Sequence, residues 1–341
     1  MKKYLLKRLA LIFLVLLGVS VITFVVSHVL PGSPEAMWVG PKPTQEQLDA
    51  AIKELGLDKP IAVQYLSYVK NLVRGDLGIS LRTRRHVTEE LSRRWGATFE
   101  LVSVSLLLAL LIGIPMGILS ATNKDKGLDH TSRAVSISGV AMPVFWLGMI
   151  LQQVLHGKLG WLPLQGRIDS QILIDSPIET ISGFYLVDSL LTANWAAFSS
   201  AFSHIVLPAL TLSFAALATI TRMSRSSMLD VLSEDYIQTS IAYGVSRRVL
   251  LYKYALKNAL IPTITVVGLS YGVMLGGSFL VESIFDWPGL GRFAVLSIEN
   301  NDFPATMGVT ILFAFTYIIL NLIVDMVYYF IDPRIKTPDM D

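Results

Sequence analysis

Residues 99–121 read FELVSVSLLLALLIGIPMGILSA, an apolar run in which Glu100 is the one charged residue. A bilayer core about 30 Å thick requires roughly 20 mainly apolar residues per spanning helix, and this run has that length. The stretch therefore predicts a helix that crosses a membrane.

Other parts of the chain repeat this pattern. The chain is 52% hydrophobic and 16% charged, whereas about 25% of the residues of a soluble domain are charged. The run at 205–220 is short and contains Pro208, but neighbouring membrane helices can satisfy the carbonyl that a proline frees. We expect an all-α membrane protein with six transmembrane helices, over residues 9–30, 99–121, 135–155, 205–220, 259–281 and 305–331.

The first apolar run has two interpretations. Basic residues precede it, as in a cleaved signal peptide. The run is longer than the usual h-region of about 7–15 residues, however, and no A-x-A cleavage site precedes Pro31. Residues 1–30 are thus predicted to form a retained N-terminal transmembrane helix.

Charge sets the expected orientation, because cytoplasmic loops retain Lys and Arg. With the N-terminus inside, the inner segments carry 15 of these residues and the two later outer segments carry three. The long outer segment is also basic, but segments beyond about 60 residues cross largely regardless of charge. Both termini are therefore expected in the cytoplasm, the C-terminal one as a tail over residues 332–341.

The long outer segment, residues 31–97, mixes turn formers with amphipathic stretches at 45–55 and 61–73. Gly56 follows the first stretch at the position of a helix C′ residue. This pattern predicts a small extracytoplasmic helical domain. Residues 98–331 are then the membrane core, with a second outer loop at 156–203 and an inner loop at 222–257.

Two motifs of enzyme sites are missing from the sequence. It contains no H-E-x-x-H of a zinc site and no Gly-Lys-Ser or Gly-Lys-Thr of a phosphate-binding loop. Cysteine is absent, and a net charge of +2 without a basic and aromatic groove argues against nucleic acid. We expect a chain that is not an enzyme and that binds no metal or other cofactor; any ATP would bind to another subunit.

The inner loop reads RMSRSSMLDVLSEDYIQTSIAYGVSRRVLLYKYALK at residues 222–257. Leu229, Leu232 and Tyr236 would share one face of a helix, and Gly244 offers a left-handed stop. One short amphipathic helix over 229–244 is therefore predicted. Its residues alone leave two interpretations open, a helix that lies on anionic lipid and a helix that docks to a partner protein.

At this point the sequence resembles a family. Residues 234–239 (EDYIQT), Gly244 and residues 258–262 (NALIP) are similar to the EAA loop of ABC-importer permeases, in the form found in dipeptide and oligopeptide permeases. The segments GFYLVD (183–188) and HIVLP (204–208) resemble the dipeptide branch. Further blocks that resemble the family occur in order at 30–34 (LPGSP), 55–60 (LGLDKP), 75–80 (GDLGIS), 143–148 (PVFWLG), 160–163 (GWLP), 281–292 (VESIFDWPGLGR) and 332–335 (DPRI).

The resemblance implies a type I, MetI-like importer in a bacterial or archaeal cytoplasmic membrane. It implies a second homologous permease subunit, an external solute-binding protein and two ATPase subunits that hold ATP and Mg. Dipeptides or short oligopeptides are the expected solute, with nickel chelates, glutathione, haem or oligosaccharides as alternatives. The inner loop would contact the ATPase through Leu232, Glu234, Asp235, Tyr236, Gln238, Thr239, Ala242 and Gly244.

This chain departs from the family in one part of that loop. It has SIAYG at residues 240–244, where the family often has Ala-Arg-Ala-Lys-Gly. The loss of two cations predicts a more apolar ATPase contact.

Several polar residues outside the loop also have two interpretations. In span six, Asn321 and Asp325 are interpreted as structural partners rather than translocation residues. Glu100 and His204 are expected to anchor the outer ends of spans two and four. On the outer side, an outer gate or binding-protein contact and a purely structural loop both remain open for Glu282, Asp286, Trp287 and Arg292.

Two other classes of function compete with an importer subunit. A secondary transporter commonly shows two repeats and buried ion-binding acids, and the sequence shows neither. A membrane-anchored receptor would have little use for six spans and an inner docking helix. A nucleotide-binding partner separates the three classes, because only the importer requires one.

Overall fold

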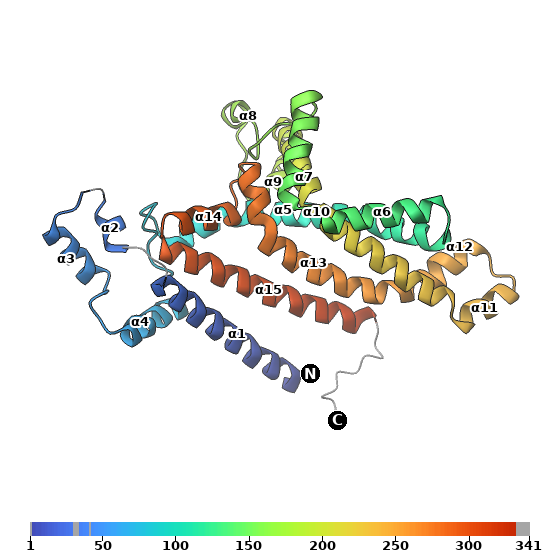
Figure 1. The fold of residues 1–341 in the computed structure, drawn as a ribbon, viewed down its shortest axis with the longest axis horizontal. Helices are drawn as coiled ribbons and strands as arrows, with labels where there is room; N and C mark the ends of the chain where they lie inside the picture. Colours follow the sequence, from blue (N-terminus) through green and yellow to red (C-terminus); the bar gives the residue numbers. More distant parts are fainter. Residues whose placement is uncertain (1, 30–33, 41, 332–341) are drawn as a thin grey trace. The chain divides into compact units, whose positions relative to one another are not determined.

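The computed structural model describes residues 2–29, 34–40 and 42–331, which are helical almost throughout (Figure 1). In this part of the chain, the β pairing is one isolated antiparallel bridge between Ile79 and His86. The all-α prediction is confirmed. The helices are α1 (Lys2–Val29), α2 (Pro34–Val39), α3 (Gln45–Glu54), α4 (Ile61–Val73), α5 (Val87–Thr122), α6 (Gly127–Ala141), α7 (Val144–Leu151), the π-helix η1 (Gln152–Lys158), α8 (Ser170–Asp175), α9 (Tyr185–Leu191), α10 (Trp195–Leu232), α11 (Asp235–Ala242), α12 (Arg247–Val249), the π-helix η2 (Leu250–Ala255), α13 (Leu256–Ile284), α14 (Leu290–Glu299) and α15 (Phe303–Ile331).

The predicted spans fall on helices. Within the described residues, four helices are long and apolar enough to cross a membrane: α5, α10, the continuous run Arg247–Ile284 and α15. The first predicted span lies on α1, in which Ile12–Ser27 forms a shorter apolar helix. Its last residue, Leu30, is outside the described residues. Pro208 sits inside the 38-residue α10 without ending it.

The third predicted span is not one continuous helix. Residues 127–141 and 144–158 form two helices that are bent by 109° at the break between them. Met142 has an extended backbone with ψ of 125°, and Pro143 follows it. A proline disfavours the helical conformation of the residue before it and has no N–H to donate, so the helix ends here. Counting the bent pair as one span gives five candidate spans in the described chain.

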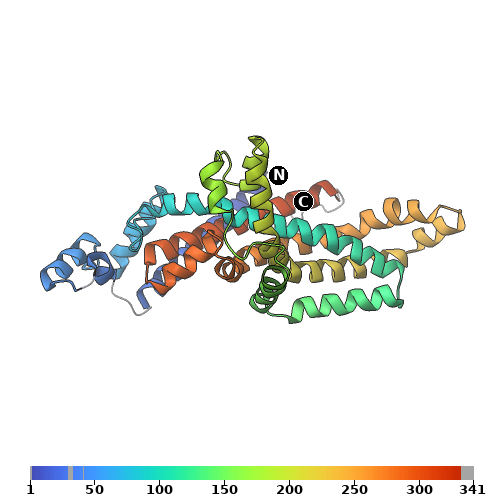
Figure 2. The same cartoon turned by 90° about the horizontal axis from the view of Figure 1, so that it is seen from above.

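The chain divides into two compact units. The larger unit comprises residues 97–288 with 319–331, and α10 is its central helix, in contact with α6, α7, α9 and α13. Figure 2 shows α6 running alongside α10. A Cβ on Gly117 would come within 2.5 Å of the Ser224 Cβ, and one on Gly139 within 2.7 Å of the Ala218 Cβ. Small residues thus allow close helix contact, as is usual in membranes.

The smaller unit comprises residues 2–96 with 289–318. Its helix α3 starts with a capping box between Thr44 and Gln47. The helix ends at Glu54 with Leu55 as C-cap, and at Gly56 φ is +67°. Leu57 N donates to Ile52 O at 2.9 Å, so the predicted C′ glycine is confirmed. Predicted helix 61–73 coincides with α4.

A loop in the smaller unit is fastened by one buried carboxylate. Asp302 is fully buried and accepts hydrogen bonds from the Ser80 hydroxyl and from Leu81 N at 3.0 Å. These bonds hold the loop that follows α4 against the turn between α14 and α15.

Candidate functional site

The inner loop of the sequence analysis folds differently from the single helix predicted over 229–244. Helix α10 continues to Leu232, and Glu234 then adopts an extended backbone with φ of −68° and ψ of 145°. A new helix, α11, begins at Asp235. Leu229 and Leu232 therefore belong to α10, and the prediction that they share a helix face with Tyr236 is wrong.

The predicted stop at Gly244 is confirmed. Its φ is +75°, Gly244 N donates to Ile241 O at 2.9 Å, and Val245 N donates to Ser240 O at 3.1 Å. This pair of bonds is the Schellman motif, which satisfies carbonyls at the end of a helix and favours glycine at C′. The chain therefore turns sharply after α11 and enters α12.

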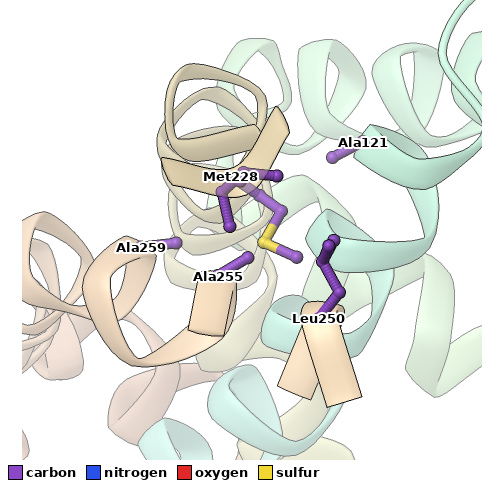
Figure 3. Close-up of a cluster of buried hydrophobic side chains, with 6 residues drawn as sticks. Ala121, Met228, Leu250, Ala255 and Ala259 are labelled. Carbon is purple, nitrogen blue, oxygen red and sulfur yellow. The ribbon is translucent and has the colours of Figure 1, made fainter. Parts of the chain in front are cut away.

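Helix α11 is anchored by a residue that the sequence analysis missed. Ile237 is fully buried in a cluster that joins the ends of several helices. Figure 3 shows Met228 from α10 lying among Ala255, Ala259 and Leu250. The cluster consists of Ala121, Met228, Ile237, Leu250, Ala255 and Ala259, from α5, α10, α11, η2 and α13. The available signal was one apolar side chain between polar neighbours in EDYIQT.

The rest of α11 is directed outward. Tyr243 and Ile241 are 85% and 53% exposed, whereas Leu232 at the end of α10 is partly buried against the Ile237 cluster. We call the exposed residues Glu234, Asp235, Tyr236, Gln238, Thr239, Ile241, Ala242, Tyr243 and Gly244 the α11 face. The structure thus brings seven of the eight predicted contact residues together on one short, exposed helix and its caps.

Two hydrogen bonds tie the α11 face to its neighbours. The Tyr236 hydroxyl accepts a bond of 2.8 Å from the Asn258 Nδ2. The Gln238 Nε2 donates to Leu232 O at 3.2 Å. Helix α11 is therefore connected both to the end of α10 and to the start of α13, in addition to the Ile237 cluster.

A buried ion pair fastens the helices beside this cluster. Asp129 on α6 is fully buried, and its carboxylate accepts two hydrogen bonds from Arg225. Nε donates to Oδ1 at 2.6 Å, and a second guanidinium nitrogen donates to Oδ2 at 2.8 Å. Ser120 on α5 donates to the same carboxylate at 2.6 Å. Two parallel bonds between Arg and a carboxylate fix direction as well as distance. Asp129 thus joins α6 to its neighbour α5, nine positions away, and to α10, 96 positions away.

Two of the predicted outer contact residues are buried. Glu282 is fully buried, with Thr98 donating to its Oε1 at 2.7 Å and Ser278 at 3.0 Å. Trp287 is 1% exposed and its Nε1 donates to Ala97 O at 2.8 Å. In this conformation neither side chain can touch an external protein, which favours the structural alternative for both.

The other two outer residues are half-buried. Asp286 adopts a left-handed backbone with φ of +49° at the turn after α13. Arg292 belongs to α14 in the smaller unit. Glu282 and Trp287, both buried in the larger unit, form no exposed contact surface there.

A second buried ion pair supports the outer loop. Glu100 and Arg167 are both buried, with side-chain exposures of 4% and 6%. The Arg167 guanidinium donates two hydrogen bonds, of 2.5 and 3.1 Å, to one carboxylate oxygen of Glu100. The other oxygen of Glu100 accepts a hydrogen bond of 2.7 Å from Leu186 N. The Arg167 guanidinium carbon lies 3.7 Å from the centroid of the Tyr185 ring. Glu100 thus has the anchoring role expected for it.

Two further predictions concern the spans. His204 bonds Ser200 O within its own helix at 2.7 Å. The Asp325 side chain and residues 332–335 lie outside the described residues.

No group of three or more His, Asp or Glu in the described chain is placed to hold a metal ion.

Comparison with known proteins gives a consistent result. Residues 113–337 match the family described as the inner membrane component of binding-protein-dependent transport systems, and residues 1–102 match its N-terminal region. The chain is 47% identical over 322 residues to the probable D,D-dipeptide transport system permease protein DdpB of Escherichia coli K12, covering 94% of both chains. It is 40% identical to the dipeptide transport system permease protein DppB of Alkalihalophilus pseudofirmus, over 98% of this chain and 100% of that one.

A more distant likeness concerns the fold. The methionine ABC transporter MetNI, solved in inward-facing conformations, contains a chain that superposes with a TM-score of 0.54 at 16% identity, over 71% of this chain and 96% of that one. The fold is therefore that of a MetI-like permease. Together with the sequence matches, this shows that the protein belongs to the binding-protein-dependent ABC importer permeases, in their dipeptide and oligopeptide group.

Proposed function

We propose that this chain is the permease subunit of an ATP-driven importer that takes up dipeptides or short oligopeptides. An external solute-binding protein delivers the peptide, and this chain and a second homologous permease form the path across the membrane. Two ATPase subunits hold ATP and Mg. The chain itself carries no catalytic group in this scheme.

The α11 face is the observation on which the coupling mechanism rests. Its residues are exposed, while Ile237 behind them is fully buried at the junction of α5, α10 and α13. Movement of an ATPase subunit against the α11 face would therefore be passed directly to the ends of three membrane helices. Its exposed Ile241 and Tyr243 fit the more apolar contact expected from the loss of two cations.

Peptides are favoured as the solute by the names of the relatives. In addition to the two above, a di/tripeptide transport system permease of Pseudomonas aeruginosa is 40% identical over 98% of this chain. Glutathione is the second candidate, because a glutathione transport system permease of Escherichia coli is 37% identical over the same share. Glutathione is itself a tripeptide, so both candidates present a free carboxylate and amide bonds.

The proposed topology follows from charge. Both termini and the α11 face lie in the cytoplasm, whereas residues 31–97 form an extracytoplasmic helical domain and 156–203 an outer loop. The Ile237 cluster is then at the inner ends of the spans and the Glu100–Arg167 pair near the outer ends. Cysteine labelling at Tyr243, with a control at Leu191, tests this, since the chain has no native cysteine.

The function is tested with the complete transporter in proteoliposomes. Wild-type complex with its binding protein is expected to take up labelled dipeptide and to hydrolyse ATP faster when dipeptide is present. Uptake of glutathione in preference to dipeptide would show that the solute is glutathione, and the proposed ATP-driven mechanism would still hold. A complex that purifies without an ATP-hydrolysing subunit, yet still transports, would contradict the mechanism itself.

A further inference from the structure

A groove lies between α6 and α10 in the larger unit. Its volume is about 510 Å³, and neither the α11 face nor the outer ion pair contributes to it. Its described lining is Ser132, Arg133, Ser136, Ile137, Val140, Ala141, Thr221, Arg222 and Arg225. We call it the α6–α10 groove.

One end of the groove is cationic. Three arginines and no acidic residue belong to its described lining. Arg225 forms an ion pair with Asp129, and a guanidinium nitrogen of Arg133 lies 3.6 Å from the same carboxylate. Arg222 is exposed, and within the described chain its side chain has no hydrogen bond or ion pair. The groove therefore keeps a positive charge that no acidic side chain among the described residues neutralises.

The other end of the groove is apolar. Ile137 and Val140 on α6 are 70% and 56% exposed. At 1.5 Å per residue, Val140 lies about 10 Å along the helix from Arg133. A second hollow of about 520 Å³, which shares Ala141 with the groove, continues past Pro143 to Phe145 and Trp146. Along α6, the positively charged end at Arg133 is thus followed toward the C-terminus by an apolar strip that contains Ile137 and Val140.

This arrangement matches an amphiphile with an anionic head. Basic pockets between membrane helices on the cytoplasmic side are suited to anionic lipid head groups. A short peptide would supply a carboxylate for Arg222 but would leave the exposed apolar strip uncovered. We propose that the α6–α10 groove binds an anionic phospholipid of the inner leaflet, with its phosphate at Arg222 and an acyl chain along Ile137 and Val140. The leaflet rests on the topology proposed above.

The test uses the complete transporter in nanodiscs of phosphatidylcholine mixed with phosphatidylglycerol, and native mass spectrometry to count retained lipids. Arg222→Gln is expected to lower the affinity for phosphatidylglycerol about fivefold, the loss expected for one cation near an anionic lipid. Arg222→Lys keeps the charge and should retain most of the binding. Ile137→Trp, which fills the apolar end, should also reduce retention without a change of charge.

Arg248→Gln is the matched control, because Arg248 is an exposed arginine of α12 that does not line the groove. It should bind lipid like the wild type. Equal phosphatidylglycerol retention in wild type and Arg222→Gln would overturn the proposal. A photo-crosslinker at position 137 that labels the second permease or the peptide, instead of lipid, would also overturn it. Dipeptide uptake, measured separately, tests the proposed function whatever the lipid result.

Discussion

The hydroxyl of Tyr236 accepts a 2.8 Å hydrogen bond from the Nδ2 of Asn258, 22 positions later in the chain. The first residue belongs to α11 and the second to the start of α13. Two separate blocks of the inner-loop motif are thus parts of one physical unit. This explains why a proline-containing segment, NALIP, accompanies the acidic one: it supplies the helix to which α11 is attached.

Tyr236→Phe removes this bond and leaves the ring. A net hydrogen bond contributes about 0.5–1.5 kcal/mol, and the exposure of Tyr236 favours the lower end of that range. We expect a small loss of thermal stability and a larger loss of peptide-stimulated ATPase activity. In a double-mutant cycle with Asn258→Ala, the two effects should not add; full additivity would contradict a functional link between α11 and α13.

Ile237→Ala is expected to be far more damaging. Truncation of a fully buried isoleucine costs about 2–5 kcal/mol through lost burial and the cavity that remains. Ile241→Ala on the same helix is the control, because that side chain is 53% exposed. Thermal unfolding of the purified complex should separate the two variants clearly. Similar melting temperatures would mean that Ile237 does not anchor α11.

Gly244→Ala tests the turn after α11. A Cβ would meet no atom within 4 Å, so the cost arises from the φ of +75° alone and should be about 1–2 kcal/mol. Gly244→Asn should be milder, since asparagine tolerates this conformation. The control is Gly276→Ala, where a Cβ also has open space and the helical backbone accepts alanine. Reduced ATPase stimulation is expected for Gly244→Ala only.

Arg167→Met should destabilise the outer loop strongly. It leaves the buried Glu100 carboxylate without its cation, and breaking a buried pair on one side costs about 3–5 kcal/mol. The double variant Glu100→Gln with Arg167→Met removes both charges and should recover much of the loss. Thermal unfolding of the complex measures both. A double variant as unstable as the single one would argue against charge as the cause.

The outer loop should also respond to acid through Asp188. Burial raises the pKa of this carboxyl, but hydrogen bonds from the Ser182 hydroxyl and from the N–H groups of Ser182, Gly183 and Ile181 lower it by more. The folded pKa therefore lies below the unfolded value of about 3.9.

Because the folded pKa is depressed, the stabilisation by Asp188 is present above the unfolded pKa and is lost as the pH falls through the folded one. Asp188→Asn should lower stability at neutral pH and show a weaker further decrease in acid. Unfolding at a series of pH values measures this. Parallel curves for wild type and Asp188→Asn would show that Asp188 contributes nothing to the acid dependence.

Local features of the fold followed directly from the sequence. Helices α3 and α4 lie where their amphipathic patterns placed them, and Gly56 and Gly244 have the left-handed φ expected of helix ends. Apolar length identified four helices long enough to cross a membrane and the bent pair as a fifth candidate in the described chain, since burial of an apolar run in lipid needs no knowledge of its neighbours. Family resemblance added the inner loop as the candidate coupling site, and the structure groups most of its residues on the α11 face.

The sequence did not reveal where packing interrupts a helix or which distant residues meet. The extended backbone at Glu234 splits one predicted amphipathic helix into two. The Glu100–Arg167 and Asp129–Arg225 pairs join positions separated by 67 and 96 residues. Periodicity describes one helix at a time, whereas a buried carboxylate is neutralised by whichever cation the packing of several helices brings to it. The sequence therefore determined most of the long apolar helices and, through family resemblance, the class of transporter. Tertiary packing decided where two predicted helices break, that Ile237 is the anchor, and that Glu282 and Trp287 are internal.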